Sequence, residues 1–291
     1  MDIAIRHPYR TGHFQWLKGN LHTHTTNSDG ARTPEDCVKA YAGRGYDFLM
    51  ISDHDRFTNP EGLDGNGMVL IPGYEITANG PHILHVNGRS CLKPVEDRQA
   101  VLDAVGQAGG FAIMCHPNWE EHFNHCPQEK LASWTGYVGL EICNGVCVWA
   151  EGSGLALDRW DMLLSAGRVV WGYATDDTHK VHTEGNAWTV VQAVERSVEG
   201  VVDALVHGRC YASTGVTIET IEVKDDTVRV VAPRADRIDV LGDFQRLAAK
   251  HRGPEACFRF SEEDIYSYVR FECHGPEGAM AWTQPFFVEI G

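Results

Sequence analysis

His22 and His24 are separated by one residue near the start of the chain. Side chains alternate with a period of two along an extended segment, so both imidazoles point to the same side. Asp29 follows in the turn-like sequence Ser28-Asp29-Gly30 and adds a carboxylate. Imidazole nitrogens and carboxylate oxygens are ligands that zinc, manganese and iron accept. The segment is a candidate metal site, although two histidines on a strand are also common as polar surface.

Further histidines and carboxylates follow short apolar runs that indicate buried strands. Leaving many ionisable groups together without a metal would cost desolvation and repulsion among the acids. A bridging carboxylate such as Glu75 would suit a pair of metals. The whole set is large enough for two or three metal sites. It comprises six histidines and three carboxylates: His22, His24, Asp29, His54, Glu75, His82, His116, Asp177 and His179.

Strands and helices alternate along the first two thirds of the chain. Helices are expected at 33–41, 94–108, 155–166 and 198–206, and strands at 47–52, 68–76, 82–86, 111–115, 137–142, 168–174 and 187–193. The first helix has a capping hydroxyl, Thr33, and a proline at its first position. Such alternation predicts an α/β fold with a parallel sheet, either open or closed as a barrel. In a barrel, the chemistry gathers at the carboxyl ends of the strands.

The pattern changes after about residue 215. Strands are expected at 216–223, 227–231, 237–241, 268–273 and 286–290, with a short helical piece near 244–250. We therefore predict two domains. The first, at 1–215, carries the candidate metal ligands, and the second is a small β-rich domain at 216–291. The second domain has no evident chemistry.

The composition restricts the classes of function. The 291 residues include 25 basic and 40 acidic side chains, a net charge of -15. An acidic surface argues against broad nucleic-acid binding. The first residues lack the apolar core of a signal peptide and no run reaches transmembrane length, so we expect a cytoplasmic protein with no membrane partner. Nine scattered cysteines are typical of reduced thiols.

Four motifs, in this order, resemble the PHP (polymerase and histidinol phosphatase) superfamily. They are His22-Thr23-His24, Ser52-Asp53-His54-Asp55, Cys115-His116-Pro117 and Asp177-Thr178-His179. The resemblance covers roughly residues 16–215. It implies a distorted (β/α)7 TIM-like barrel with a metal cluster, usually trinuclear, at the carboxyl ends of its strands.

The resemblance also implies an arrangement of the ligands. His22 and His24 would hold one metal together with Glu75 and Asp177. Glu75 would bridge to a second metal bound by His82 and His116, and Asp29, His54 and His179 would hold the third. His85 is an alternative to His82, and Glu141 is either a further ligand or a support behind the ligands. Aspartate at position 29 resembles phosphoesterases that act on small nucleotides and RNA ends, whereas histidine there is frequent in monoester phosphatases.

Two late segments resemble a sub-branch with a C-terminal β-rich piece, which includes carbaryl-hydrolase-like proteins that hydrolyse a carbamate ester. These segments are 208–215 and Ala281-Trp282-Thr283-Gln284-Pro285. The late motif is short, so the expectation for the substrate remains a phosphate ester. Carboxyl or carbamate ester hydrolysis is the alternative reaction for the same cluster.

We expect a metal-dependent phosphoesterase that uses two or three manganese, zinc or iron ions. The ions would lower the pKa of a bridging water and stabilise charge on the substrate. Asp177 is the candidate base, and Arg56, Lys180 and His182 are candidate phosphate-binding residues. The expected partner is a small-molecule phosphate ester or a short nucleic-acid end. A non-catalytic metal-binding regulatory domain is the alternative from another class.

Overall fold

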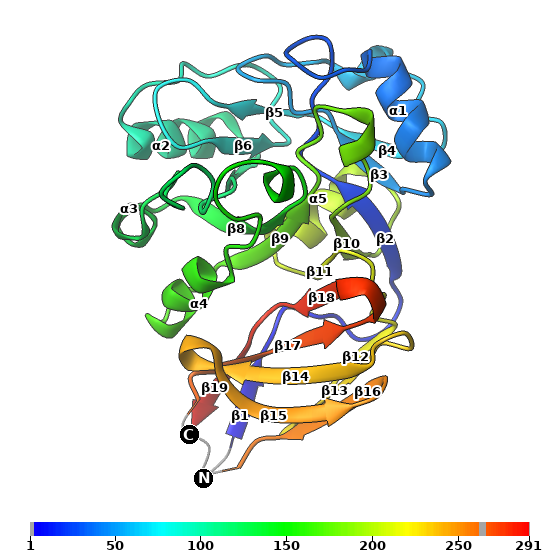
Figure 1. The fold of residues 1–291 in the computed structure, drawn as a ribbon, viewed down its shortest axis with the longest axis vertical. Helices are drawn as coiled ribbons and strands as arrows, with labels where there is room; N and C mark the ends of the chain where they lie inside the picture. Colours follow the sequence, from blue (N-terminus) through cyan, green and yellow to red (C-terminus); the bar gives the residue numbers. More distant parts are fainter. Residues whose placement is uncertain (1–2, 262–265, 291) are drawn as a thin grey trace.

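Strands dominate the architecture, and the helices lie on the outside of one half of the molecule (Figure 1). A computed structural model of the chain describes residues 3–261 and 266–290. In Figure 1 the upper half contains the α-helices and strands β2 to β11, and the lower half is built mainly of strands, β1 among them. The chain is therefore a mixed α/β protein with two parts, as the sequence predicted.

One sheet of the upper half has the strand order β4-β3-β2-β10-β11. The strand bounds are β2 Gln15–Asn20, β3 Phe48–Met50, β4 Val69–Ile71, β10 Trp188–Ala193 and β11 Cys210–Ser213. Strand β3 is parallel to β2 and β4, whereas β10 is antiparallel to both β2 and β11. The predicted parallel pairing thus holds for only part of this sheet.

The second sheet of the upper half has the order β5-β6-β7-β8-β9. Its strands are β5 Gly73–Ile76, β6 Ile83–Val86, β7 Phe111–Met114, β8 Tyr137–Asn144 and β9 Trp171–Thr175. Strands β7, β8 and β9 are parallel, but β6 is antiparallel to β5 and β7. Among residues 3–261 and 266–290 the strands form separate sheets and no closed barrel, so the predicted (β/α)7 barrel is not confirmed.

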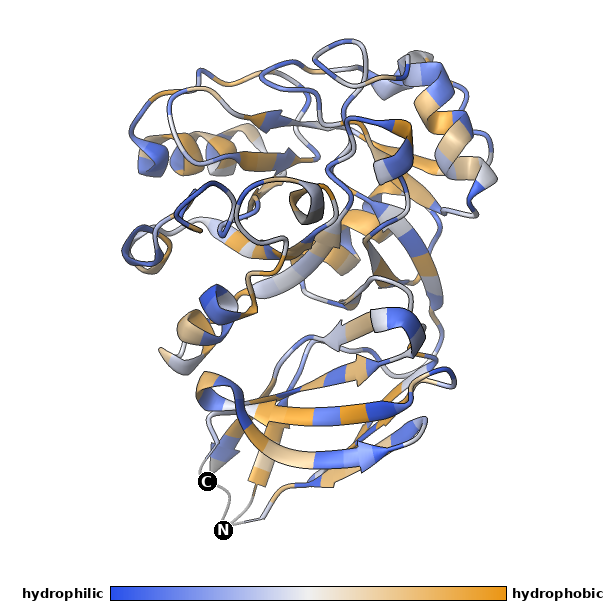
Figure 2. Ribbon diagram, viewed as in Figure 1, coloured by the Kyte–Doolittle hydropathy of each residue, from blue (hydrophilic) through white to orange (hydrophobic). Residues whose placement is uncertain are grey.

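A hydrophobic cluster contributed by strands of both sheets joins them. It includes Leu17, Phe48, Ile71, Ile113 and Tyr173, all buried. At one end of the sheets, single bridges also connect Thr23 with Thr178 and His54 with Glu75. The burial of this apolar surface stabilises the arrangement of the two sheets. Figure 2 shows β6 as largely hydrophobic and much of the loop surface above it as hydrophilic.

Four of the five α-helices in the described residues occur close to the places that the sequence predicted, and α3 was not predicted. Their bounds are α1 Pro34–Gly43, α2 Arg98–Ala108, α3 Gln128–Ser133, α4 Leu157–Ser165 and α5 Val198–Val206. Short 3-10 turns are η1 Pro60–Gly62, η2 Cys147–Trp149, η3 Val181–Thr183, η4 Asp243–Gln245 and η5 Pro276–Gly278. Helix α1 begins as expected, because the Thr33 side chain accepts a hydrogen bond from the Asp36 N–H at 3.2 Å. Among the described residues, no helix is long and apolar enough to span a membrane.

The lower half contains the C-terminal strands together with the N-terminal one. Its strands are β1 Ile3–Arg6, β12 Thr220–Lys224, β13 Thr227–Val231, β14 Arg237–Gly242, β15 Arg246–Arg252, β16 Glu255–Arg259, β17 Tyr268–His274, β18 Met280–Thr283 and β19 Phe286–Ile290. The helical piece expected near 244–250 was wrong, because most of this segment forms β15, paired with β14. All nine cysteines of the chain are free thiols.

Two strand pairings cross the predicted boundary at residue 215. Strand β1 pairs with β19, so residues 3–6 lie in the sheet of the lower half. Strand β11 pairs with β18, which makes one sheet continuous between the two halves. The division at residue 215 stays a prediction, and hydrogen bonds join the parts on either side of it.

A buried ion pair also joins the two halves. Arg270 of β17 donates to both carboxylate oxygens of Asp161 in α4, at 2.9 and 2.6 Å. The Tyr268 hydroxyl donates to the same carboxylate at 2.5 Å, and Arg270 also donates to Glu272 at 2.6 Å. Arg270 is fully buried, so its charge depends on these acidic partners.

Asp161→Ala should destabilise the protein strongly, because it leaves the Arg270 guanidinium buried beside only one carboxylate. We expect a loss of about 3–5 kcal/mol in the free energy of unfolding, measured by urea denaturation. Glu255→Ala is the control, since it removes an ion pair with Arg229 on the exposed surface and should leave the midpoint unchanged. Equal effects of the two substitutions would contradict the role of the buried pair.

Candidate metal centre

The nine candidate ligands gather at one end of the two upper sheets. His22 and His24 follow β2, His54 follows β3, His116 follows β7, and Asp177 and His179 follow β9. Glu75 lies in β5, and His82 comes just before β6. Because β5 and β6 are antiparallel, the end of one and the beginning of the other meet at the same edge. His82 therefore reaches this edge from the beginning of its strand, as the range expected for that strand, 82–86, implies.

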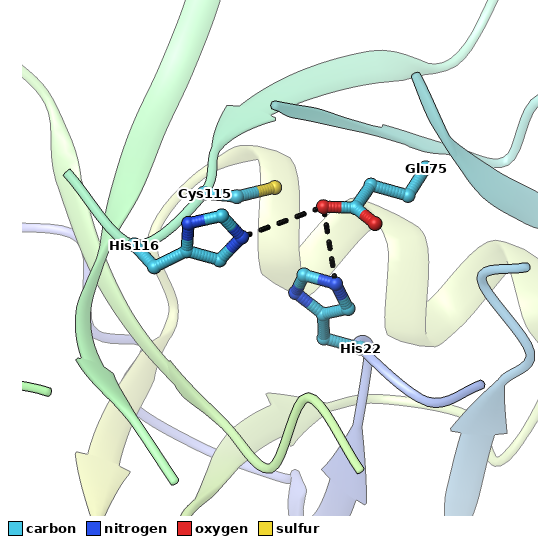
Figure 3. Close-up of side chains that lie close together, drawn as sticks. All are labelled: His22, Glu75, Cys115 and His116. Atoms are coloured by element: carbon cyan, nitrogen blue, oxygen red, sulfur yellow. Dashed lines mark ion pairs between the residues drawn. The ribbon is translucent and has the colours of Figure 1, made fainter. Parts of the chain in front are cut away.

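The carboxylate of Glu75 is the centre of the group. It is fully buried and lies close to five imidazoles. The nitrogen–oxygen distances are 2.7 Å to His54, 2.9 Å to His82, 3.3 Å to His22, 3.5 Å to His116 and 3.6 Å to His24. Figure 3 shows the Glu75 carboxylate between His22 and His116, with the Cys115 thiol nearby. Both oxygens of Glu75 are therefore placed for bridging.

Asp177 is a second shared carboxylate. Its Oδ1 lies 3.0 Å from His24 and 3.1 Å from His22, and its Oδ2 lies 3.8 Å from His116. The backbone at Asp177 has a φ of 52°, and that at His116 has a φ of 23°. A positive φ is unfavourable for residues other than glycine and is concentrated at functional sites. The chain thus turns sharply where it presents these two side chains.

Asp29 forms the outer part of the group. Its Oδ1 lies 3.4 Å from Nε2 of His179, 3.5 Å from Nε2 of His54 and 4.0 Å from Nδ1 of His24. The Asp29 side chain is 56% exposed, in contrast to Glu75. His179 is oriented by its other ring nitrogen, Nδ1, which lies 2.9 Å from the backbone oxygen of Asp177. Asp29 therefore faces both the histidines and the open side of the site.

The residues fit a multi-metal site. Side-chain atoms that could hold one ion together occur in overlapping groups: His22, His24 and Asp177; His24, Asp29, His54 and His179; His22, Glu75, Cys115 and His116; and His82, His116 and His125. Within the described residues, the buried Nε2 of His22 and Nδ1 of His24 have no hydrogen-bond partner. Unpaired buried imidazole nitrogens beside carboxylate oxygens are what divalent cations bind.

The electrostatics of the site favour the charged forms of Glu75, Asp177 and His22. Burial would raise the pKa of Glu75, but the neighbouring imidazoles, His22 first, hold it well below its ordinary value. Burial likewise opposes ionisation of Asp177, and again His22 and its neighbours lower that pKa. The pKa of His22 is raised well above its ordinary value, because Asp177, Glu75 and Glu141 outweigh its burial. These carboxylates therefore need positive charge at the centre of the site.

Glu141 supports the group from behind. Its Oε1 lies 2.7 Å from Nδ1 of His22, which turns Nε2 of His22 toward Glu75 and Asp177. The same carboxylate accepts hydrogen bonds from the Thr175 hydroxyl at 2.6 Å and the His116 N–H at 2.8 Å. A carboxylate on the far nitrogen of a histidine is the usual support for a metal ligand. Glu141 thus occupies the supporting position that was one of its two expected roles.

Two supporting residues were missed by sequence reasoning. The Asn144 amide donates to Glu141 at 2.9 Å and to Asp177 at 3.1 Å, and Asn144 is the last residue of β8. Its place at a strand end was the signal that could have found it. Asp53 accepts hydrogen bonds from the side chains of Thr25, Ser28 and Thr58, and so fixes the loop that carries Asp29.

His82, rather than His85, faces the site. His85 points away and lies 2.7 Å from the backbone oxygen of Gly109. His125 lies beside His82, where its Nε2 accepts the His82 N–H at 3.0 Å and its Nδ1 lies 2.9 Å from Glu120. Burial, assisted by His116 and His82, lowers the pKa of His125 to about 2. Both nitrogens of His125 are engaged, so it is placed to support His82.

A cavity of about 320 Å³ opens at the metal centre. Asp29, His54, His82, His116, Asp177 and His179 line it, together with Thr77, Trp119, Val146, Cys147 and Ala150. Arg56, Lys180 and His182, the expected phosphate-binding residues, do not line it. Arg56 instead donates to the Asn27 backbone oxygen at 3.1 Å, and the His182 ring packs against Trp149. The structure therefore gives these three residues no contact with the cavity.

Glu141→Gln should weaken metal binding while the fold stays intact, because it removes the charge that orients and polarises His22. We expect manganese affinity, measured by titration of the metal-free protein, to fall about 10–100-fold. Glu129→Gln, on the exposed surface of α3, is the matched control and should bind manganese as the unaltered protein does. Unchanged affinity in Glu141→Gln would contradict the supporting role.

The comparisons with known proteins agree with this fold. No protein-family model matches the chain, and no curated protein matches it. A two-domain protein from Bacteroides vulgatus, described as containing a predicted PHP-like metal-dependent phosphoesterase, matches with a TM-score of 0.53 at 17% identity, over 94% of this chain and 95% of its own. An amidohydrolase from Chromobacterium violaceum matches at 17% identity over 56% of this chain and 88% of its own, and its TM-score of 0.41 is too low to indicate a shared fold. The chain therefore shares the fold of the two-domain protein from Bacteroides vulgatus.

Proposed function

We propose that the protein is a metal-dependent hydrolase that cleaves phosphate esters. The observation that carries this proposal is the sharing of two buried carboxylates, Glu75 and Asp177, among the histidines at the base of a cavity. Shared carboxylates place ions a few ångströms apart, which is the arrangement used for hydrolysis of phosphate esters. A substrate bound in the cavity would lie against Asp177 and the histidines that line it.

Two or three manganese, zinc or iron ions would be held by the groups described above. His22, His24 and Asp177 would hold the first ion and Glu75, His82 and His116 the second. Asp29, His54 and His179 would hold the third. When bound, such ions supply a nucleophilic hydroxide near neutral pH and neutralise charge that develops on the substrate.

Asp177 is the residue of this chain best placed to move a proton. It lines the cavity, and its Oδ2 is fixed by the Asn144 amide at 3.1 Å. A carboxylate held in this way can accept a proton from a water at the base of the cavity. Val146, Cys147 and Ala150 line the cavity with apolar surface, which excludes bulk water from part of it. Trp119 adds a flat surface for an aromatic or base-like group.

The charge of the cavity favours a second candidate, hydrolysis of a carboxyl or carbamate ester. No lysine or arginine occurs among the described residues that line the cavity. A phosphomonoester dianion would depend on the ions alone for charge balance, whereas an uncharged ester or a phosphodiester monoanion needs less compensation. Among phosphate esters we therefore favour a diester or a nucleotide end over a monoester.

Hydrolysis of four p-nitrophenyl compounds by manganese-loaded protein tests the proposal. We expect turnover of bis(p-nitrophenyl) phosphate to exceed that of p-nitrophenyl phosphate, because the diester carries less charge. The carboxyl-type substrates are p-nitrophenyl acetate and a p-nitrophenyl carbamate. Glu75→Gln is the control for contaminating activity and should reduce turnover to the background rate.

Turnover of the acetate or carbamate alone would overturn the phosphoesterase proposal and establish the second candidate. No turnover of any of the four by protein shown to be fully loaded with metal would favour the non-catalytic binding domain.

A further inference from the structure

A fully buried arginine, Arg98, binds the loop that connects β5 and β6. Its side chain is 1% exposed, and among the described residues no carboxylate forms an ion pair with it. Its Nη2 donates instead to the backbone oxygens of Thr77, Ala78 and Gly80, at 3.0, 2.8 and 2.8 Å. A buried charge needs compensation, and here the carbonyl groups of the loop supply it. Gly80 permits the close approach, because a Cβ at that position would lie 2.8 Å from Nε of Arg98.

Asp55 binds the same loop through its N–H groups. The Asp55 carboxylate accepts the backbone N–H groups of Thr77 and Ala78, at 3.0 and 2.9 Å. These two residues are therefore bound at their N–H groups by a negative charge and at their oxygens by a positive charge. Hydrogen bonds to charged groups are stronger than those between neutral groups. Asp55 and Arg98 thus form a clamp on the backbone of residues 77–78.

Thr77 connects this clamp to the metal centre. Its hydroxyl lies 2.7 Å from Nδ1 of His54, and Thr77 also lines the cavity. Oε2 of Glu75 lies 2.7 Å from the same nitrogen, so Nδ1 of His54 is enclosed by two oxygen acceptors. The other ring nitrogen, Nε2, lies 3.5 Å from Asp29. The partner at one imidazole nitrogen determines which nitrogen is left for a metal, so His54 is oriented to use Nε2.

We propose that Asp55 and Arg98 are positioning residues for the outer metal ion, which is the ion expected among Asp29, His54 and His179. The clamp fixes the backbone at Thr77, and the Thr77 hydroxyl then holds the His54 ring with Nε2 toward Asp29. This inference rests on the metal centre of the proposed function. It adds to that centre two charged side chains that form no hydrogen bond with any of its candidate ligands.

Titration of the metal-free protein with manganese, followed by electron paramagnetic resonance of the free ion, tests the clamp. Asp29→Asn identifies the outer ion as the one whose Kd it raises most. Arg98→Met and Thr77→Val should each raise the Kd of that ion about tenfold, the usual effect of removing a support behind a metal ligand. The Kd values of the other ions should stay unchanged.

Arg168→Met is the matched control. Arg168 also donates to two backbone oxygens, those of Leu131 and Ala132, at 2.6 and 3.2 Å. Its substitution removes a comparable structural contact away from the metal centre and should leave every manganese Kd unchanged. Arg98→Lys keeps the positive charge and should lose less affinity for the outer ion than Arg98→Met. If circular dichroism shows that Arg98→Met does not fold, Asp55→Asn and Thr77→Val decide the test.

The inference is overturned if Asp55→Asn and Thr77→Val bind the outer ion as the unaltered protein does, or if they weaken all ions equally. Manganese binding that does not respond to Asp29→Asn would show that the outer ion is absent, which also overturns it. In these cases the other ions still bind, and the proposed function stands. An unaltered protein that binds no manganese would overturn the proposed function together with the inference.

Discussion

A fully buried carboxylate surrounded by imidazoles is the constraint on which the metal centre depends. Glu75 has no exposed surface, and five histidine rings lie within 3.6 Å of its oxygens. Removing a carboxylate from water is costly unless positive charge compensates it. The neighbouring imidazoles, His22 first, lower the pKa of Glu75 despite its burial, and Asp177 adds a second buried carboxylate beside the same rings. Divalent cations would supply further positive charge and would account for the convergence of so many candidate ligands.

The two upper sheets bring the candidate ligands together. The two upper sheets bury a common apolar cluster, and their strand ends meet where single bridges join Thr23 to Thr178 and His54 to Glu75. The hairpin of β5 and β6 brings Glu75 and His82 to the same edge. Glu141, Asn144 and Asp53 then fix the ligand side chains and the loop before Asp29 through hydrogen bonds. The rigid sheets thus set the distances, and these supporting residues set the orientations.

The sequence predicted the position of the site better than it predicted the strand topology around it. Polar residues at the ends of buried strands are visible in the sequence, so the nine candidate ligands could be named together, and the structure places them at one end of the two upper sheets. The run 68–76 was expected to be one strand, but it forms β4 and β5 on either side of Pro72, and the two belong to different sheets. Proline has no N–H for a ladder, so Pro72 was the local signal of this break. The pairing of residues 3–6 with β19 depends on contacts between the two ends of the chain, which no local pattern encodes.

The three candidate phosphate-binding residues stay a prediction, and none of them lines the cavity at the metal centre. Arg56 and Lys180 lie near ligands in the sequence, but neighbours along a loop point in different directions once the loop is fixed. The Arg56 guanidinium donates to the backbone oxygen of Asn27 in the loop after β2, and Lys180 leads into the turn η3. By contrast, the position of Glu141 beside the site could be predicted. It lies on β8, the strand between β7 and β9, which His116 and Asp177 follow.

Anomalous diffraction from manganese-soaked crystals tests the central claim most directly. The account predicts at least two anomalous peaks beside Glu75, one among His22, His24 and Asp177 and another between Glu75, His82 and His116. A third peak is expected near Asp29, His54 and His179. A fully soaked crystal with no peak within bonding distance of Glu75 would contradict the account.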